Sequence, residues 1–154
     1  MPQTLSNVLL HAVFHKGLSS KIVRPEDQSL LNAYIISICD HLKCPCLIAN
    51  GPGDHEHLLF VLSPQLSYSE VIKEVKRLSS AFLKKQNPQY YHSFHWQAGY
   101  GMFSVSYKSK EAVYQYIVNQ QLHHQKVSVE KEWISLLKSA NITDYHPDLY
   151  WIRE

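Results

Sequence analysis

Cysteines, excess charge and long apolar runs are all scarce in this chain of 154 residues. The three cysteines, Cys39, Cys44 and Cys46, are an odd number, which indicates reduced thiols in a cytoplasm rather than a secreted disulfide framework. No apolar run approaches the roughly 20 residues of a membrane-spanning helix, and the polar start carries no signal-peptide pattern. These absences predict a cytoplasmic protein without a membrane segment.

The composition describes an ordinary folded domain. A formal net charge of +2 does not by itself indicate a nucleic-acid partner. Hydrophobic residues make up 45% of the chain, which excludes a disordered protein and, at this length, suits one domain with a sizeable core. Because no repeat, low-complexity segment or linker is visible, we expect a single domain over residues 1–154.

Hydrophobic periodicity predicts the order strand, helix, strand, strand, helix, strand, followed by extra helices. This order is the split β-α-β arrangement of ferredoxin-like α+β domains, here with an additional C-terminal helix and tail. The predicted strands cover 6–15, 44–50, 55–62, and 94–96 with 102–107. The predicted helices begin near Pro25, after the capping-box pattern at Ser67, after Ser109, and at Val129, and they end near residues 41, 86, 125 and 138.

Two histidines two positions apart, His55 and His57, stand at the entry to the apolar run Leu58–Leu62. The preceding sequence Gly-Pro-Gly-Asp predicts a turn. Side chains at positions i and i+2 of a strand point to the same face, so the pair can supply two imidazole ligands to one metal ion. The same spacing also arises on the solvent face of an edge strand, and the pair alone does not exclude that.

The histidine pair belongs to the first of three sequence blocks, Asp54–Leu59. The second block is Trp96–Ser106, and the third is Tyr116–Gln120, which His123 and His124 follow. In this order and spacing the chain resembles the single-tyrosine HUH transposases of insertion sequences and their repeat-associated relatives. One departure is that the usually apolar middle residue of the histidine motif is Glu56, which we expect to point away from the metal.

The resemblance implies a DNA transposase that cuts and rejoins single strands. It implies that Tyr116 is the nucleophile and that His55, His57 and Gln120 hold Mg²⁺ or Mn²⁺. The product is a 5′-phosphotyrosine link and a free 3′-hydroxyl, which allows rejoining without ATP. The resemblance further implies recognition of hairpin DNA and a homodimer in a prokaryotic cytoplasm, in which the tyrosine helix can complete the partner's site.

The spacing on the predicted helix supports the choice of tyrosine. Tyr116 and Gln120 are four apart and share a helix face, whereas Tyr114 points to a different face. A phenol has a pKa near ~10 and is a poor nucleophile until it is activated.

Weaker candidates for DNA contacts lie elsewhere. Basic residues of the second predicted helix form either a solvated face or a phosphate-contacting face. They are Lys73, Lys76, Arg77, Lys84 and Lys85. Tyr100 lies beside two glycines and is a candidate DNA contact. His123 and His124 are candidate partners of the metal ligands, phosphate contacts or surface residues.

Two other functions remain open from the sequence. One is a non-catalytic, domesticated protein that binds nucleic-acid hairpins on the same fold. The other is a structural zinc protein built on His41, Cys44 and Cys46, although the cysteine spacing is not the usual one. A requirement for magnesium or manganese favours the transposase, whereas tightly held zinc favours the structural protein.

Overall fold

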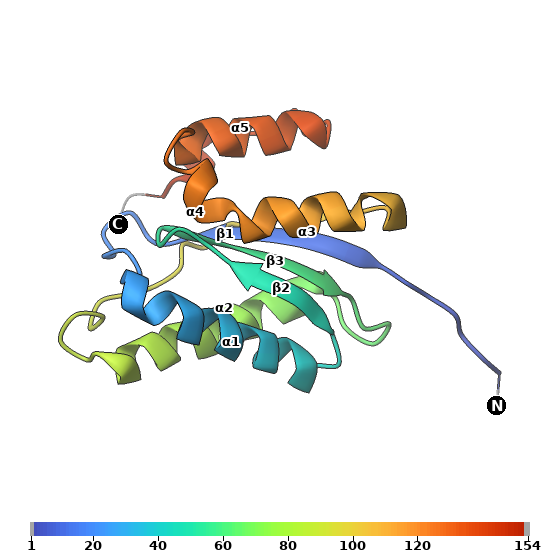
Figure 1. Ribbon diagram of the computed structural model, residues 1–154, viewed down its shortest axis with the longest axis horizontal. Coiled ribbons are helices and arrows are strands. Elements are labelled where there is room, and N and C mark those ends of the chain that lie inside the picture. The colour runs from blue at the N-terminus through green and yellow to red at the C-terminus, as the bar shows by residue number, and fades with distance from the viewer. Residues whose placement is uncertain (1, 153–154) are drawn as a thin grey trace.

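One sheet of four antiparallel strands, in the order β2-β3-β1-β4, lies at the centre of the protein (Figure 1). The computed structural model describes residues 2–152. The strands are β1 (Leu9–His15), β2 (Cys46–Asn50), β3 (His55–Val61) and β4 (Gly101–Ser104). The helices are α1 (Pro25–His41), α2 (Tyr68–Gln86), α3 (Lys110–Val118), α4 (Gln120–His123), α5 (Val129–Ser139) and α6 (Pro147–Tyr150), with a 3-10 turn, η1, at Tyr107–Ser109.

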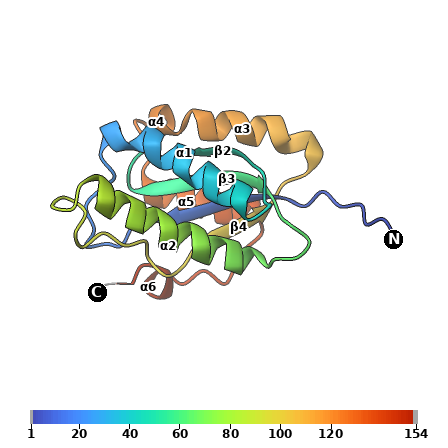
Figure 2. The same ribbon diagram turned by 90° about the horizontal axis from the view of Figure 1, so that it is seen from below.

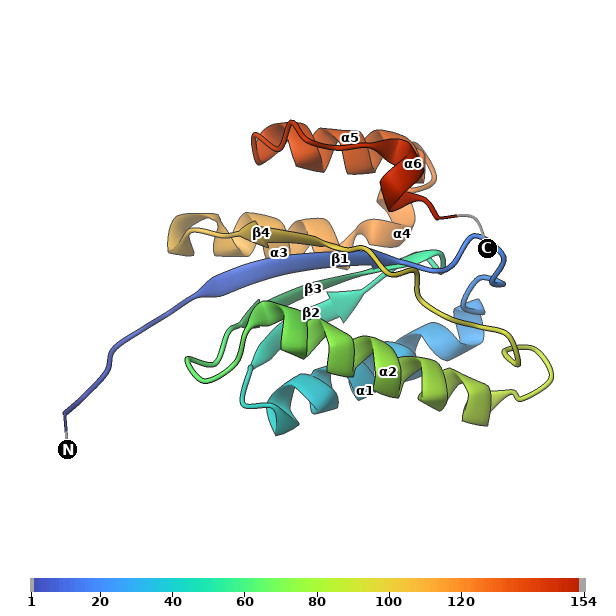
Figure 3. The same cartoon turned by 180° about the vertical axis from the view of Figure 1, so that it is seen from behind.

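Helices cover both faces of the sheet. In Figure 1, α1 and α2 lie below the sheet, and α3, α4 and α5 lie above it. Figure 2 views the molecule from below and shows α1 and α2 side by side across the sheet, while Figure 3 shows α6 against the end of α5. The element order β1-α1-β2-β3-α2-β4 and the strand order confirm the predicted ferredoxin-like α+β fold with added C-terminal helices.

The starts of α1 and α2 follow from their sequences. Pro25 occupies the first turn of α1, where its missing N–H costs no hydrogen bond, and acidic residues follow it near the positive helix end. At α2, the Ser67 side chain accepts from the Glu70 backbone, and the Glu70 carboxylate accepts from the Ser67 backbone. This reciprocal capping box confirms the predicted start of the helix.

Alternation along the two central strands divides their side chains between two layers. On the α1/α2 side, Phe14 of β1 packs with Leu58 and Phe60 of β3, and all three are fully buried in the main apolar core. His55 and His57 alternate with those β3 residues and therefore face α3 and α5. One strand thus serves the apolar core and a polar cluster at once.

Glu56, the departure from the histidine motif, points into the α1/α2 layer and not toward the cluster. It is 1% exposed, and its Oε1 lies 2.5 Å from the Gln28 Nε2 of α1. Burial raises the pKa of Glu56 to about 8, so the carboxyl group is mostly neutral at pH 7. A neutral Glu56 that is hydrogen-bonded to Gln28 is compatible with the apolar core between the sheet and α1.

The fourth strand is shorter than predicted. Only residues 101–104 form β4, and Trp96 makes an isolated bridge with Lys16 and lies outside any strand. The Trp96 indole instead donates to the Ser79 hydroxyl at 2.9 Å and packs edge-on against Phe14. Side-chain packing therefore determines the conformation of the chain around Trp96, and an alternating sequence pattern does not encode such packing.

The helix predicted from residue 110 to 125 is interrupted. α3 ends at Val118, and α4 resumes at Gln120 after a break at Asn119. Ser109 does not cap α3: its backbone is already helical and its side chain makes no capping hydrogen bond. At the break, the Asn50 side chain of β2 donates to the Ile117 carbonyl at 2.9 Å, which adds a side-chain hydrogen bond to the end of α3.

The cysteines make no metal site with their neighbouring histidine. Cys39, Cys44 and Cys46 are free, and the first two are buried. Within residues 2–152 no metal-binding group forms around His41, Cys44 and Cys46. In the same part of the chain, no helix has the length and apolarity needed to cross a bilayer.

Candidate active site

A glycine-containing turn delivers the chain to His55. Gly53 has a φ of 121°, which side chains other than glycine rarely adopt. At Gly51, a Cβ atom would lie 1.9 Å from the His55 carbonyl oxygen. The predicted turn is therefore confirmed, and its glycines allow β3 to begin at His55.

Four imidazoles cover the α5 side of β1 and β3. They belong to His11, His15, His55 and His57, each at most 5% exposed. The rings of His15 and His55 stack at 5.2 Å, and those of His11 and His57 at 5.1 Å, with His11 Nε2 and His57 Nδ1 2.8 Å apart. Because β3 is a central strand and the pair is buried, His55 and His57 are not the solvent face of an edge strand.

A carboxylate from α5 enters the middle of this imidazole group. Glu132 is 3% exposed, and its Oε1 lies 3.0 Å from His55 Nε2 and 3.3 Å from His57 Nε2. Its Oε2 lies 3.1 Å from His124 Nε2. Ser128 caps α5 by accepting from the Lys131 backbone, which fixes the helix start one turn before Glu132.

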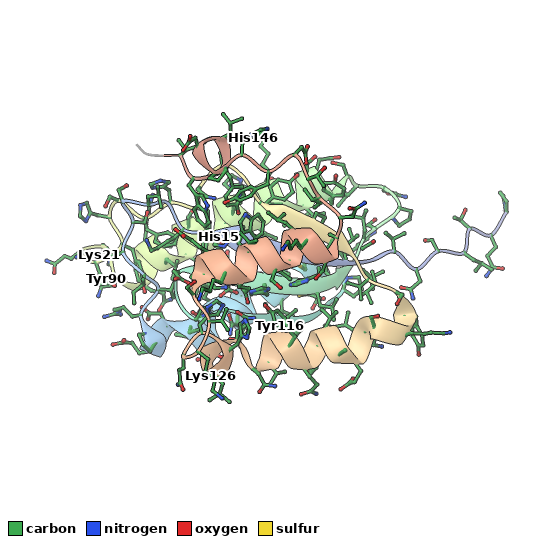
Figure 4. All side chains as sticks on the ribbon, turned by 90° about the horizontal axis from the view of Figure 1, so that it is seen from above. His15, Lys21, Tyr90, Tyr116, Lys126 and His146 are labelled. Atoms are coloured by element: carbon green, nitrogen blue, oxygen red, sulfur yellow. The ribbon has the colours of Figure 1, made fainter. Side chains whose placement is uncertain are left out.

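Tyr116 and Gln120 converge on the same carboxylate. The Tyr116 hydroxyl donates a hydrogen bond to Glu132 Oε2, and the Gln120 amide donates to that oxygen at 3.0 Å. Gln120 Oε1 lies 3.3 Å from His55 Nε2. The structure therefore brings the predicted nucleophile and all three predicted metal ligands together, although a helix break separates Tyr116 from Gln120. Figure 4 shows His15 and Tyr116 on either side of α5.

Burial and charge set the protonation of the cluster. Burial lowers the pKa of His57 to about 4, so this imidazole is neutral at pH 7. Burial also lowers the pKa of His55, but hydrogen bonds to Asp54 and Glu132 outweigh it and raise that pKa to about 9. Burial alone would raise the pKa of Glu132, yet hydrogen bonds from His124, His55 and His57 hold it well below its usual range. The carboxylate is therefore an anion among imidazoles.

The tyrosine is held in its protonated form. Burial and the neighbouring Glu132 anion both raise the pKa of Tyr116 above the ordinary phenol value. Its hydroxyl is consequently a hydrogen-bond donor here, and it must lose that proton when it acts as a nucleophile.

The donor set fits a divalent metal ion. His55, His57, His124 and Glu132 each offer one ligand atom, and these atoms lie within 4.8 Å of one another. Two or three imidazoles with one carboxylate suit many divalent cations, and the Gln120 oxygen adjoins them. Asp54 accepts from His55 Nδ1 at 2.6 Å, and such an outer carboxylate orients a ligating imidazole.

The predicted basic face lies away from this cluster, because α2 is on the opposite side of the sheet (Figure 1). Lys76 donates to the carbonyls of Gln97, Ala98 and Gly99 at 2.8–3.1 Å, so it holds the loop before β4. The other predicted contacts on α2 are Lys73, Arg77, Lys84 and Lys85, all exposed, with Arg77 paired to Glu74 at 2.6 Å. Tyr100 is half-buried beside Lys76.

His123 and His124 belong to the cluster rather than to a separate surface. His123 Nε2 lies 3.4 Å from Glu132 Oε2, and its ring lies 5.2 Å from that of Tyr116. The His124 ring lies 4.6 Å from that of His55. Both residues therefore border the tyrosine and the histidine pair.

Sequence reasoning missed Glu132, His11 and His15. A signal for the histidines was available, since residues four apart in a strand share a face and the mixed face of the first strand already contained His11. The signal for Glu132 was an acid beside Trp133 on the buried stripe of a helix. Neither pattern identifies a partner, because the approach of α5 to the sheet is a tertiary contact.

Comparison with known proteins identifies the family. The sequence pattern described as "Transposase IS200 like" matches residues 4–120, well over half of the chain. The chain belongs to the IS200-like transposase family. Membership implies a DNA-cleaving enzyme. The match ends at Gln120, so Glu132, α5 and α6 lie outside the IS200-like segment.

Two solved structures share the fold. A candidate transposase from Deinococcus radiodurans R1 is 18% identical with a TM-score of 0.62, and the alignment covers 78% of this chain and 95% of that one. A REP-associated tyrosine transposase bound to a REP hairpin is 14% identical with a TM-score of 0.56, covering 100% and 93%. At these identities the likeness is one of fold. No curated protein matches the chain.

Proposed function

We propose that this IS200-like transposase cuts and rejoins single-stranded DNA with Tyr116 as the nucleophile. The observation that carries the proposal is the meeting of Tyr116, His55 and His57 at one buried carboxylate, Glu132. These residues come from separate elements that fold together only in the tertiary structure. A hydroxyl nucleophile beside a candidate metal centre is the arrangement that phosphoryl transfer requires.

In the chemical step one proton is transferred, one phosphorus–oxygen bond forms and another breaks. The Tyr116 oxygen attacks the phosphorus of the scissile phosphodiester, a tyrosine O–P bond forms, and the bond from phosphorus to the 3′ oxygen breaks. Glu132 Oε2 already accepts the hydrogen bond from this hydroxyl, so it is placed to take the proton. That proton ends on the departing 3′ oxygen, which leaves a 5′-phosphotyrosine and a free 3′-hydroxyl. Attack by another 3′-hydroxyl reverses the step and joins strands.

The proposed metal ligands are His55 and His57, with Gln120 and Glu132 completing the set. Mg²⁺ or Mn²⁺ held by these residues would polarise the phosphate and offset the charge on its oxygens. The neutral His57 imidazole is ready to ligate, and Asp54 fixes the orientation of the His55 ring. The four side chains proposed as ligands are each at most 3% exposed.

Hairpin DNA is the substrate class that we propose. The REP-associated relative of the same fold is described as bound to a REP hairpin, and the family is one of transposases. A homodimer also stays a prediction. The apolar C-terminal residues of this chain pack on its own sheet, among them Trp133 and Tyr150 around Phe103. Tyr116 reaches the histidine pair of its own chain, so a site completed in trans is not required by this arrangement.

The nucleophile is tested by comparing two tyrosines. Tyr116→Phe removes only the attacking oxygen, so the covalent adduct with labelled hairpin DNA should disappear while folding and DNA binding persist. Tyr114→Phe is the matched control, because Tyr114 makes no hydrogen bond to Glu132, and it should retain the adduct. Mass spectrometry of the trapped, nuclease-trimmed adduct locates the modified residue.

Three outcomes would contradict the proposal. A nucleotide found on Tyr114, or full cleavage by the Tyr116→Phe protein, would overturn the choice of tyrosine. Tight hairpin binding by the wild-type protein without any adduct, in the presence of either metal, would instead establish a non-catalytic hairpin-binding protein.

A further inference from the structure

A cavity of about 460 Å³ opens beside the imidazole group, between the loop after β1 and the segment around α6. Its lining includes His15, Lys16, Asp54, Glu130, Asp148 and Trp151. A second cavity of about 390 Å³ adjoins it and shares Ile22, Asp54 and Val129 with it. Both volumes lie in the range of small-molecule sites and exceed the space that one planar base needs.

We propose that the first cavity binds one nucleobase of the DNA strand that is cut, in contact with Trp151. This inference rests on the proposed function, because it assumes a DNA strand at the cluster. It assigns to the C-terminal segment a role in choosing the nucleotide next to the cleaved phosphate.

The position of the cavity supports the proposal. Asp54 lines both cavities and also accepts from His55 Nδ1 at 2.6 Å. His15 lines the first cavity, and its ring lies 5.2 Å from that of His55. His124, which contacts Glu132, lines the second cavity. A strand that presents a phosphate to the cluster therefore has its neighbouring nucleotides beside these openings.

A residue that lines the cavity, His15, has one buried ring nitrogen without a hydrogen-bond partner within residues 2–152. His15 is 1% exposed, and its Nε2 has no hydrogen-bond partner among residues 2–152. Its other nitrogen, Nδ1, is 2.7 Å from the Tyr150 hydroxyl, which locks the ring. An unsatisfied buried polar group costs about 1–3 kcal/mol, and a base edge offers the donors and acceptors that would satisfy it.

Charge determines which part of a nucleotide enters. Among residues 2–152, three carboxylates line the cavity, from Asp54, Glu130 and Asp148, and one ammonium, that of Lys16. A phosphate would be repelled there, whereas the exocyclic amino group of cytosine, adenine or guanine can donate to a carboxylate. We therefore expect the base to point inward and thymine, which lacks that amino group, to bind least well.

Trp151 supplies the aromatic surface. Its ring lies 4.8 Å from that of His15, and its indole nitrogen donates to the Tyr145 hydroxyl at 2.8 Å, which holds the ring in place. Stacking of a base on an aromatic side chain is worth about 1–3 kcal/mol. Trp151 and α6 lie beyond residue 120, so this part of the subsite is outside the segment that the family pattern covers.

Photochemical cross-linking tests the position of the base. The Tyr116→Phe protein, which leaves the strand uncut, is mixed with random-sequence single-stranded DNA that contains 5-iododeoxycytidine, and the mixture is irradiated. Mass spectrometry should find a cross-linked peptide in which Trp151 carries the nucleotide. Cross-links at other residues with none at Trp151 would overturn the inference and leave the proposed function standing. A wild-type protein that neither binds DNA nor forms an adduct would overturn both.

A binding series separates stacking from folding. Trp151→Ala should weaken binding of a strand with cytosine at the cross-linked position by roughly tenfold, and Trp151→Phe should restore most of it. Removing that one base from the strand should weaken wild-type binding equally but leave Trp151→Ala binding unchanged. The control is Tyr107→Ala, which removes an aromatic ring that is 73% exposed on η1 and should bind like wild type. Equal sensitivity of wild type and Trp151→Ala to the missing base would contradict the proposal.

Discussion

The two faces of the sheet differ in the polar side chains that they bury beside their apolar residues. The α1/α2 face buries Phe14, Leu58 and Phe60, all 0% exposed, in an apolar core. The α3/α5 face buries four imidazoles and the Glu132 carboxylate at nearly the same depth. Hydrophobic burial stabilises the first face, whereas buried ionisable groups cost free energy unless they are paired. Such groups concentrated on one face therefore indicate a functional site.

The period of a β-strand makes this division possible. Successive residues of β3 alternate between the two layers, so Leu58 lies in the core while His57 lies in the cluster. The rigid apolar layer thus positions the reactive layer to which it is covalently joined. We expect substitutions in the apolar core of the α1/α2 face to change stability, and substitutions in the polar cluster of the α3/α5 face to change activity.

After Tyr116→Phe, the largest loss of adduct formation is expected for His57→Ala on the polar face. Loss of an outer partner of a metal ligand already costs about 10- to 100-fold, so loss of a ligand should reduce adduct formation by more than about 100-fold. Hairpin affinity should change little, because most contacts to DNA lie elsewhere. The control is His92→Ala, an exposed histidine outside the cluster. Normal cleavage by His57→Ala with added magnesium or manganese would show that the site is wrongly assigned.

Phe60→Ala tests the apolar face. Removing this fully buried ring should lower the free energy of unfolding by about 3–5 kcal/mol, through lost burial and the cavity that remains. Urea denaturation measures the change, and Leu122→Ala, at a residue that is 61% exposed, should change it by less than about 0.5 kcal/mol. A loss of activity without a loss of stability in Phe60→Ala would contradict the division between the faces.

The apolar layer was predictable from the sequence and the polar layer only partly. The strand and helix order, the capping box at Ser67 and the turn before His55 are local patterns, and each is confirmed by the structure. The break at Asn119 was not predicted, because an Asn50 side chain from a distant strand stabilises it. Glu132 was not predicted for the same reason. Its partners lie on β3 and at the end of α4, and no local sequence pattern shows that α5 packs against them.

Glu132→Gln tests whether the carboxylate belongs to the metal centre. The substitution keeps the shape of the side chain and removes its charge, so Mn²⁺ should bind about 10- to 100-fold more weakly. Isothermal titration measures this binding without any cleavage reaction. Glu130→Gln removes an exposed carboxylate on the same helix and should bind Mn²⁺ like wild type. Unchanged Mn²⁺ affinity in Glu132→Gln would show that Glu132 is not a ligand and that the histidines and Gln120 hold the metal without it.

The smallest change in stability is expected at an ion pair at the start of α1. Asp27 of α1 accepts from Arg24 Nε at 2.8 Å and from the Tyr91 hydroxyl at 2.6 Å. Burial raises the pKa of Asp27, but these two hydrogen bonds outweigh burial and hold the pKa below its ordinary value. The folded state therefore binds the proton less readily than the unfolded chain, whose Asp pKa is about 3.9.

The sign of the pH dependence follows from that depressed pKa. The stabilisation is fully present above the unfolded pKa and is lost as the pH falls through the folded pKa. Asp27→Asn should accordingly lower the free energy of unfolding by about 1 kcal/mol at pH 7 and by progressively less below about pH 4. Glu26→Gln, beside it but 66% exposed, should show neither effect. Urea titrations from pH 7 to pH 3 provide the measurement, and a difference that stays constant with pH would show that Asp27 stabilises the fold by packing instead of by charge.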